Sequence, residues 1–158
     1  MGAGFYNKDN YVTQRSLGYL LRHLVKLLEP RAEAMFADAA LSFTQWLALR
    51  LVHDRVVDNS AGIARMLCHN SGAVTRLVDQ LEARGLLERQ RDSGDRRIVR
   101  LATTAAGVAA IENVNPRMIG MWNELLDEFS NSEVETLLSL LGRLMTRLEA
   151  DEAKESVK

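Results

Sequence analysis

The sequence predicts a mainly α-helical fold with one small β-hairpin. Only two prolines interrupt its 158 residues, so long stretches are free to be helical. Within these stretches apolar residues recur every three or four positions, which is the spacing of one helix face. A dense turn signal at residues 92–95, Asp-Ser-Gly-Asp, separates two short segments that can pair as strands.

Composition indicates one domain, or one domain with helical extensions. With 47% hydrophobic residues, a chain of 158 residues can bury a sizeable core. Its single cysteine, Cys68, excludes an internal disulfide framework and fits a reducing compartment. No apolar run approaches ~18 residues and the N-terminus has no signal-peptide core, so neither a membrane span nor export is expected. We therefore expect a cytoplasmic protein.

Residues 1–40 should contain two helical stretches. From Tyr11 to about Glu29 an apolar stripe predicts the first helix. Pro30 should bend or interrupt it, and a second helical stretch should continue to Ala40. The stripe consists of Leu17, Leu20, Leu21, Leu24, Leu27 and Leu28.

The next helix should be mostly buried. Ser42 or Thr44 can cap it, and few polar positions follow, which predicts a helix packed on several sides. After it, Val56 and Val57 could add a short strand beside the hairpin.

A pair of short helices joined by a tight turn follows. Ser60 should cap a helix over residues 61–67, and residues 67–70 should form the turn. Asn70 can cap the second helix, and Gly85 stands where a left-handed residue would end it. The apolar face of this second helix consists of Val74, Leu77, Val78 and Leu81, and its opposite face of Ser71, Thr75, Arg76, Asp79 and Glu82.

The hairpin should follow this helix directly. Residues 86–90 and a segment through Val99 and Leu101 read as its strands. A helix that can enter a major groove, beside a basic hairpin that can reach the flanking backbone or minor groove, is typical of a winged helix-turn-helix that binds duplex DNA. The tip of the hairpin carries Asp95, Arg96 and Arg97, and Arg91 and Arg100 lie on the strands behind it.

The C-terminal third should be helical. Thr104 can cap a long helix, bent near Pro116, that runs to Phe129. Asn131 should break it, and residues 132–135 have the spacing of a capping box for a last helix. The wide apolar stripe of that helix consists of Val134, Leu137, Leu138, Leu141, Leu144, Met145 and Leu148.

The formal net charge of −1 hides two oppositely charged segments. Residues 65–100 hold eight arginines against five acidic residues, whereas residues 124–155 hold nine acidic residues against three basic ones. The basic segment is the one expected to meet phosphate. The acidic segment reads as a solvated face.

The run TRLVDQLEARGLLER, followed by DSGDRR and TTAAG, resembles the signature of the MarR family of bacterial transcriptional regulators. The resemblance covers the DNA-binding half closely and the rest of the chain by helix pattern. The sequence departs from it at Cys68, where family members commonly have glycine, and at residues 71–73, where bulkier polar residues are usual.

The resemblance implies three regions in one intertwined domain: N-terminal dimerisation helices at 1–40, a winged helix-turn-helix lobe at 41–103, and linker and dimerisation helices at 104–158. A DNA-binding lobe of ~70 residues does not need apolar helices from both chain ends. We expect these helices to pack on each other and on a second copy, giving a homodimer. The alternative is that they fold back on the monomer core.

A dimer of this kind should bind a palindromic double-stranded DNA site, with its recognition helices about 34 Å apart. Ser71, Thr75 and Arg76 are expected to reach bases or phosphates. At the hairpin tip the resemblance implies that Arg97 enters the minor groove, that Asp95 holds its guanidinium and that Arg96 contacts phosphate. The alternative for Asp95 and Arg97 is an exposed ion pair worth ~0 to 1 kcal/mol.

The resemblance also implies a repressor that responds to a small aromatic carboxylate. By position, the ligand pocket would use Arg22, Ser42, Trp46 and Arg50, with a guanidinium for the carboxylate and the indole for the ring. The alternative is that Trp46 belongs to the core and Arg50 pairs with an acidic residue. No cofactor or metal is expected.

Other classes of protein fit the sequence less well. His23, His53 and His69 are scattered, and the sequence shows no phosphate-binding loop or metal-ligand spacing, which argues against an enzyme. A redox-responsive regulator acting through Cys68 is one alternative, although Cys68 also reads as a small turn residue. A winged-helix module for protein contacts is another.

Overall fold

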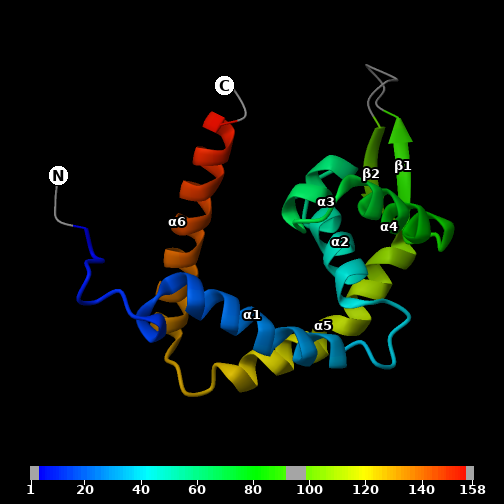
Figure 1. The fold of residues 1–158 in the computed structure, drawn as a ribbon. Coiled ribbons are helices and arrows are strands. Elements are labelled where there is room, and N and C mark those ends of the chain that lie inside the picture. The colour runs from blue at the N-terminus through cyan, green and yellow to red at the C-terminus, as the bar shows by residue number, and fades with distance from the viewer. Residues whose placement is uncertain (1–3, 92–98, 156–158) are drawn as a thin grey trace. The chain divides into compact units, whose positions relative to one another are not determined.

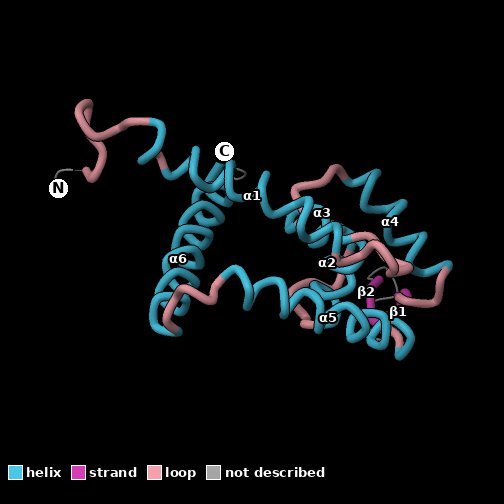
Figure 2. The backbone as a smooth tube through the Cα atoms, turned by 90° about the horizontal axis from the view of Figure 1, so that it is seen from below, coloured by secondary structure: helices cyan, strands magenta, loops and turns pink. Residues whose placement is uncertain are grey.

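The computed structural model describes residues 4–91 and 99–155 and is mainly helical, with one two-stranded antiparallel sheet in the described part (Figure 1). The predicted fold class is confirmed. Figure 2 shows how little of the backbone is strand. The elements are a 3-10 turn η1 (Thr13–Arg15), α1 (Leu17–Ala34), α2 (Phe43–His53), α3 (Ser60–Met66), α4 (Ser71–Ala83), β1 (Leu87–Arg91), β2 (Val99–Thr103), α5 (Ala105–Leu125) and α6 (Asn131–Glu155).

The chain forms two compact units, residues 1–118 and residues 119–158, and α5 crosses the boundary between them. Among the helices of the described ranges, none is both long enough and apolar enough to cross a membrane.

In the first unit, α2, α3 and α4 gather beside the β1–β2 hairpin around a shared core (Figure 1). The predicted apolar face of α4 is confirmed, because Val74, Val78 and Leu81 are at most 1% exposed. The core of this lobe also includes Ala48, Leu49, Val52, Val57, Ile63, Leu86, Leu87 and Leu101. Burial of this apolar area is what holds three short helices and a hairpin together.

The hairpin is antiparallel and in register from Leu87 opposite Thr103 to Arg91 opposite Val99. The predicted strand at Val56 and Val57 is wrong, because neither residue is a strand residue in the structure. Among the described residues, one backbone bond joins this loop to the hairpin, from the Leu101 amide to the Asp58 carbonyl at 2.7 Å. A left-handed residue at Arg55, with φ of 58°, turns the chain so that Val57 is buried while Val56 stays exposed.

Two predictions for the N-terminal region are wrong. α1 begins after Ser16 rather than near Tyr11, and it continues through Pro30 to Ala34. Proline removes one helix hydrogen bond, but the amides that follow it can still bond. No second helix follows; instead the amide of Phe36 bonds to the Glu33 carbonyl at 2.9 Å in a tighter turn.

That turn places Phe36 in the core. Phe36 is 5% exposed, and its ring lies 5.9 Å from that of Phe43 and 5.8 Å from that of Trp46. The aromatic contacts account for the loss of the predicted helix, because a continuing helix would carry Phe36 to a different place.

The helix caps agree with the sequence in some places and differ in others. The capping box of α2 uses Ser42 and Gln45, as one predicted alternative had it. α3 is capped by the Asn59 side chain, which accepts from the Gly62 amide at 2.8 Å, so the predicted Ser60 cap is wrong. α5 ends at Leu125 rather than Phe129.

The capping box of α6 lies two residues before the predicted one. The Ser130 amide donates to Glu133 Oε2 at 2.8 Å, and Ser130 Oγ accepts from the Glu133 amide at 3.4 Å. Asn131 therefore begins the helix instead of breaking it. Hydrogen bonds from Ser130 lower the pKa of the Glu133 carboxyl.

Candidate nucleic-acid interface

α4 is held at both ends by local signals that the sequence contained. The Asn70 side chain accepts from the Ala73 amide at 2.8 Å, which satisfies a free donor of the first turn. At the other end Gly85 has φ of 67°, and the Leu86 amide bonds back to the Leu81 carbonyl at 2.9 Å. With one face buried, α4 presents its opposite face in a fixed orientation.

The predicted DNA-contacting residues of α4 share this exposed face. Ser71, Thr75 and Arg76 are all exposed. The Thr75 hydroxyl donates to the Ser71 carbonyl at 2.9 Å, so its oxygen is left to accept from a partner. No ion pair or hydrogen bond within residues 4–91 and 99–155 engages the Arg76 side chain. These three residues can therefore donate to and accept from an outside partner.

The turn between α3 and α4 is strained at Cys68. Cys68 has φ of 52°, and the His69 amide bonds to the Ala64 carbonyl at 3.0 Å, which is the helix ending that usually has glycine. A side chain in this conformation costs about 1–2 kcal/mol. The thiol is exposed, and the His69 ring donates toward the Leu67 carbonyl rather than to the thiol.

A double ion pair ties the hairpin to α4, and sequence reasoning missed it. Arg89 of β1 pairs with Asp79 at 2.7 Å and also with Glu82. The hydrogen bond to Asp79 raises the pKa of Arg89, and the charges of both carboxylates add to the effect. The single positive charge of Arg89 offsets part of the negative charge that these two carboxylates would otherwise present to phosphate. Strand alternation gave the signal, because Arg89 shares a side of the hairpin with the buried Leu87.

A second ion pair ties the other strand to the loop before α3. Arg100 of β2 pairs with Asp58, and Asp58 also accepts from the Asn59 side-chain amide at 2.9 Å. The hydrogen bond from Asn59, followed by that from Arg100, lowers the pKa of the Asp58 carboxyl. Both strands of the hairpin are thus fixed by ion pairs to elements of the same lobe.

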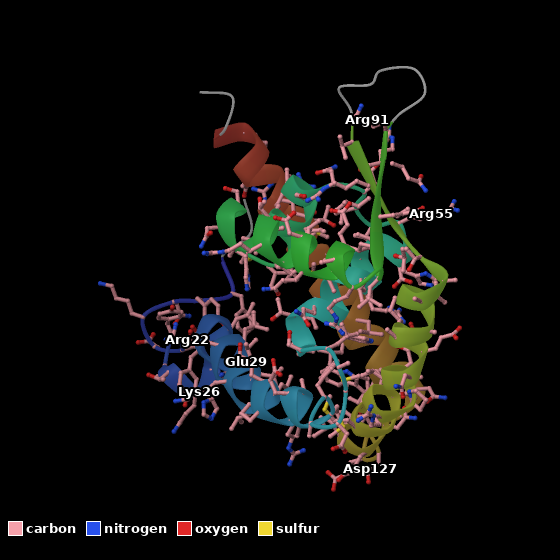
Figure 3. All side chains as sticks on the ribbon, turned by 90° about the vertical axis from the view of Figure 1, so that its right-hand side faces the viewer. Arg22, Lys26, Glu29, Arg55, Arg91 and Asp127 are labelled. Carbon is pink, nitrogen blue, oxygen red and sulfur yellow. The ribbon has the colours of Figure 1, made fainter. Side chains whose placement is uncertain are left out.

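The predicted tip residues Asp95, Arg96 and Arg97 lie outside the described residues. The nearest described basic residue on β1 is Arg91, which is exposed and stands at the end of the strand (Figure 3).

The structure brings together two of the predicted ligand residues. Arg50 lies with its guanidinium carbon 5.8 Å from the ring centre of Trp46, which is within cation–π range. Arg50 also pairs with Asp54 at 2.8 Å and donates to Asn115 at 3.4 Å. Trp46 stacks with Phe43 at 6.1 Å. The Arg50 contacts agree with the alternative of an arginine paired with an acidic residue, and Trp46 is half-buried in an aromatic cluster.

The other two predicted ligand residues are placed differently. The Ser42 hydroxyl accepts from the Gln45 amide at 3.2 Å as part of the cap of α2. Arg22 is exposed on α1 and makes no ion pair or hydrogen bond with any described residue (Figure 3). Trp46 Nε1 is buried and has no hydrogen-bond partner in the described part of the chain.

The arrangement of α3, a tight turn, α4 and a β-hairpin directly after it defines a winged helix-turn-helix protein. Residues 41–99 match the family model described as MarR family. The match confirms the resemblance seen in the sequence for the winged helix-turn-helix part of the chain, and MarR family proteins are transcriptional regulators rather than enzymes.

Solved structures of the same fold cover nearly the whole chain. The transcriptional regulator BldR from Sulfolobus solfataricus is 26% identical, with a TM-score of 0.74 over 90% of this chain and 99% of its own. CouR from Rhodococcus jostii RHA1 bound to p-coumaroyl-CoA is 20% identical, with a TM-score of 0.73 over 85% and 95%. MepR from S. aureus, in a DNA complex, is 20% identical, with a TM-score of 0.69 over 87% and 99%.

Proposed function

We propose that this chain is a dimeric, sequence-specific DNA-binding repressor whose affinity for DNA is modulated by a small aromatic anion. The observation that carries the DNA-binding part is the exposed polar face of α4, bounded by caps and fixed to a basic hairpin by Arg89. A capped helix with an exposed arginine on its outer face suits the major groove.

The α4 residues divide by the contacts they would make. Arg76 would donate to guanine or to a phosphate, while Ser71 and Thr75 would accept or donate at base edges and backbone oxygens. Because Gly72 and Ala73 add no polar atoms to the first turn of α4, we expect groove shape to contribute to selectivity. Arg97 and Asp95 at the hairpin tip would add minor-groove contact, with Arg96 on phosphate.

The terminal helices support a dimer. α1 exposes an apolar stripe, and α6 exposes another, each with side chains about half accessible. Apolar surface on this scale marks an interaction site in a chain of this size. We assign a second copy as the occupant, because reading a palindrome requires two recognition helices. The exposed side chains are Leu17, Leu20, Leu24, Val25 and Leu27 of α1, and Leu137, Leu138, Leu140, Met145 and Leu148 of α6.

The test of DNA binding is a fluorescence anisotropy titration of the full chain with duplex from the gene's own upstream region at two salt concentrations. We expect specific binding that weakens steeply as salt increases. Arg76→Ala should lose about tenfold or more in affinity. Arg31→Ala, an exposed arginine on α1, is the matched control and should change little. Binding that is equally strong with and without Arg76 would contradict the assigned helix face.

The ligand part rests on Trp46, Arg50, Ser42 and Arg22. The buried Trp46 Nε1 without a partner is a donor that a ligand oxygen could satisfy, and Arg50 lies against the same indole. CouR was solved with an aromatic thioester bound, which is a property of that protein. A ligand would act by binding one spacing of the two recognition helices better than another.

A panel of phenolic acids added to the protein–DNA complex tests this part. A compound that lowers DNA affinity should lose its effect in Trp46→Phe, which keeps the ring stacking and removes the indole donor. An unchanged response in Trp46→Phe would move the ligand site away from Trp46.

A further inference from the structure

The side chain of Gln45 joins the first turn of α2 to the C-terminal end of α4. Its amide nitrogen donates to Gln80 Oε1 at 3.2 Å. Its oxygen Oε1 accepts from the Arg84 guanidinium at 3.4 Å and from the Ser42 amide at 3.2 Å. One half-buried side chain therefore bonds to both ends of a connection between two helices of the same lobe (Figure 1).

Arg84 extends this connection to the chain before α2. Arg84 is the C-terminal cap residue of α4 and precedes the left-handed Gly85. Its guanidinium also donates to the Ala40 carbonyl at 2.6 Å, and a hydrogen bond from a charged donor is stronger than one between neutral groups. The end of α4 is thus bonded to the segment in which α2 begins. We call the bonds that Gln45 and Arg84 make here the Gln45 network.

The same turn of α2 contains two residues of the ligand pocket proposed above. Ser42 shares the capping box with Gln45, because Ser42 Oγ accepts from the Gln45 amide at 3.2 Å. Trp46 follows Gln45 directly, and its amide bonds to the Ser42 carbonyl at 3.0 Å. A displacement of this turn would therefore move Gln45 together with Ser42 and Trp46.

The Gln45 network holds α4 at the end opposite to its predicted DNA contacts. Ser71 lies in the first turn of α4 and Gln80 in its last turns, which at 1.5 Å per residue places them about 14 Å apart along the axis. A tilt of about 5° at the C-terminal end would then move the first turn by about 1 Å. Hydrogen bonds to base edges do not tolerate a displacement of that size.

We infer that Gln45 is a positioning residue through which the first turn of α2 and α4 change position together. The inference rests on the proposed function, which assigns DNA to α4 and a ligand to the first turn of α2. Two coupled binding sites affect each other by the same free energy, whichever is occupied first. DNA bound to α4 should therefore change the surroundings of Trp46, just as a ligand beside Trp46 should change the affinity for DNA.

The emission of Trp46 tests this coupling without any effector. Trp122→Phe leaves Trp46 as the single tryptophan of the chain. The full chain is titrated with labelled duplex from the gene's own upstream region, and anisotropy and tryptophan emission are read in the same samples. We expect Trp46 emission to change in wavelength or intensity as the duplex saturates. The difference in emission between the unaltered chain and Trp46→Phe measures the same signal with Trp122 in place.

The two readings separate failure of the inference from failure of the proposed function. Saturated duplex with unchanged Trp46 emission would overturn the coupling and leave DNA binding intact. A chain that binds no duplex would overturn both, because the coupling requires DNA on α4.

Three variants in the Trp122→Phe chain separate the Gln45 network from the cap of α2. Gln45→Ala removes both and should lose the Trp46 response while duplex still saturates. Gln45→Glu can keep the capping box and still accept from Arg84 and from the Gln80 amide, so it should retain the response. The double variant Gln80→Ala with Arg84→Ala keeps the capping box and removes only the bonds to α4, and it should lose the response.

A response that persists in the double variant would show that Gln45 serves only the cap of α2, and would overturn the inference. The matched control is Gln14→Ala, which removes the same side chain from an exposed position in η1. It should retain the full Trp46 response. Loss of the response in Gln14→Ala would show that the signal does not depend on the Gln45 network, and would also overturn the inference.

Discussion

Val74, Val78 and Leu81 of α4 are at most 1% exposed, whereas Leu137 and Leu138 of α6 are 47% and 58% exposed. Both helices carry an apolar stripe of similar width, so the stripe alone does not explain the difference. The apolar face of α4 is buried against α3 and the hairpin of the same lobe. The stripe of α6, like that of α1, keeps its side chains half accessible. The lobe thus covers its apolar residues within one chain, whereas the stripes of α1 and α6 stay exposed.

The largest effect should come from placing a charge on the uncovered stripe. Leu138→Glu should abolish the dimer at micromolar concentration, because each copy would bury an unpaired carboxylate, at a cost of several kcal/mol per site. Sedimentation equilibrium measures the mass. Thr136→Glu adds the same charge on the opposite side of α6 and should leave the dimer intact. A Leu138→Glu protein that remains dimeric would show that α6 does not form the interface.

A cavity in the lobe should cost stability without changing the dimer. Leu49 is fully buried, and Leu49→Ala should lower the free energy of unfolding by about 2–5 kcal/mol. Denaturant unfolding at fixed protein concentration measures the change. The matched truncation Leu24→Ala on α1, where the side chain is 51% exposed in the monomer, should instead raise the dissociation constant of the dimer, measured by sedimentation equilibrium. Equal behaviour of the two variants would remove the distinction between the regions.

The same contrast explains what the sequence could predict. α4 was predicted closely because its signals are local: apolar spacing, Asn70 at one end and Gly85 at the other. The helix through Pro30 and the missing strand at Val56 depend on packing that local patterns do not encode. Phe36 is not helical because its ring packs on an aromatic residue of α2. Arg89 bonds to carboxylates that lie seven and ten residues earlier in the chain.

A smaller effect should follow from releasing the hairpin from α4. Arg89→Ala should lower the free energy of unfolding by under about 1 kcal/mol, because the ion pair is exposed. It should nevertheless weaken DNA binding about tenfold, because the hairpin would no longer be held at a fixed angle to α4. Anisotropy with the same duplex measures the affinity.

The double variant Asp79→Asn with Glu82→Gln separates position from charge. It keeps Arg89 and makes the lobe more positive, so charge alone predicts tighter binding to DNA. If Arg89 acts by positioning the hairpin, the double variant should bind more weakly than the parent. Tighter binding would show that the pairing acts only by offsetting carboxylate charge and not by positioning the hairpin.

The smallest effect concerns the turn before α4. Cys68→Gly removes the strain of the left-handed backbone, which raises the free energy of unfolding by about 1–2 kcal/mol. Glycine also gives the unfolded chain more freedom, which lowers the free energy of unfolding by about 0.5–1 kcal/mol. Unfolding should therefore require up to about 1.5 kcal/mol more, without a change in DNA affinity. Cys68→Ser removes the thiol but keeps the side-chain strain, so it should show no gain. Both variants lack the thiol, so they also test whether Cys68 has a redox role. If oxidant changes the DNA affinity of both variants as it does that of the parent, a redox role for Cys68 is excluded. If the change is lost in both, the role is established.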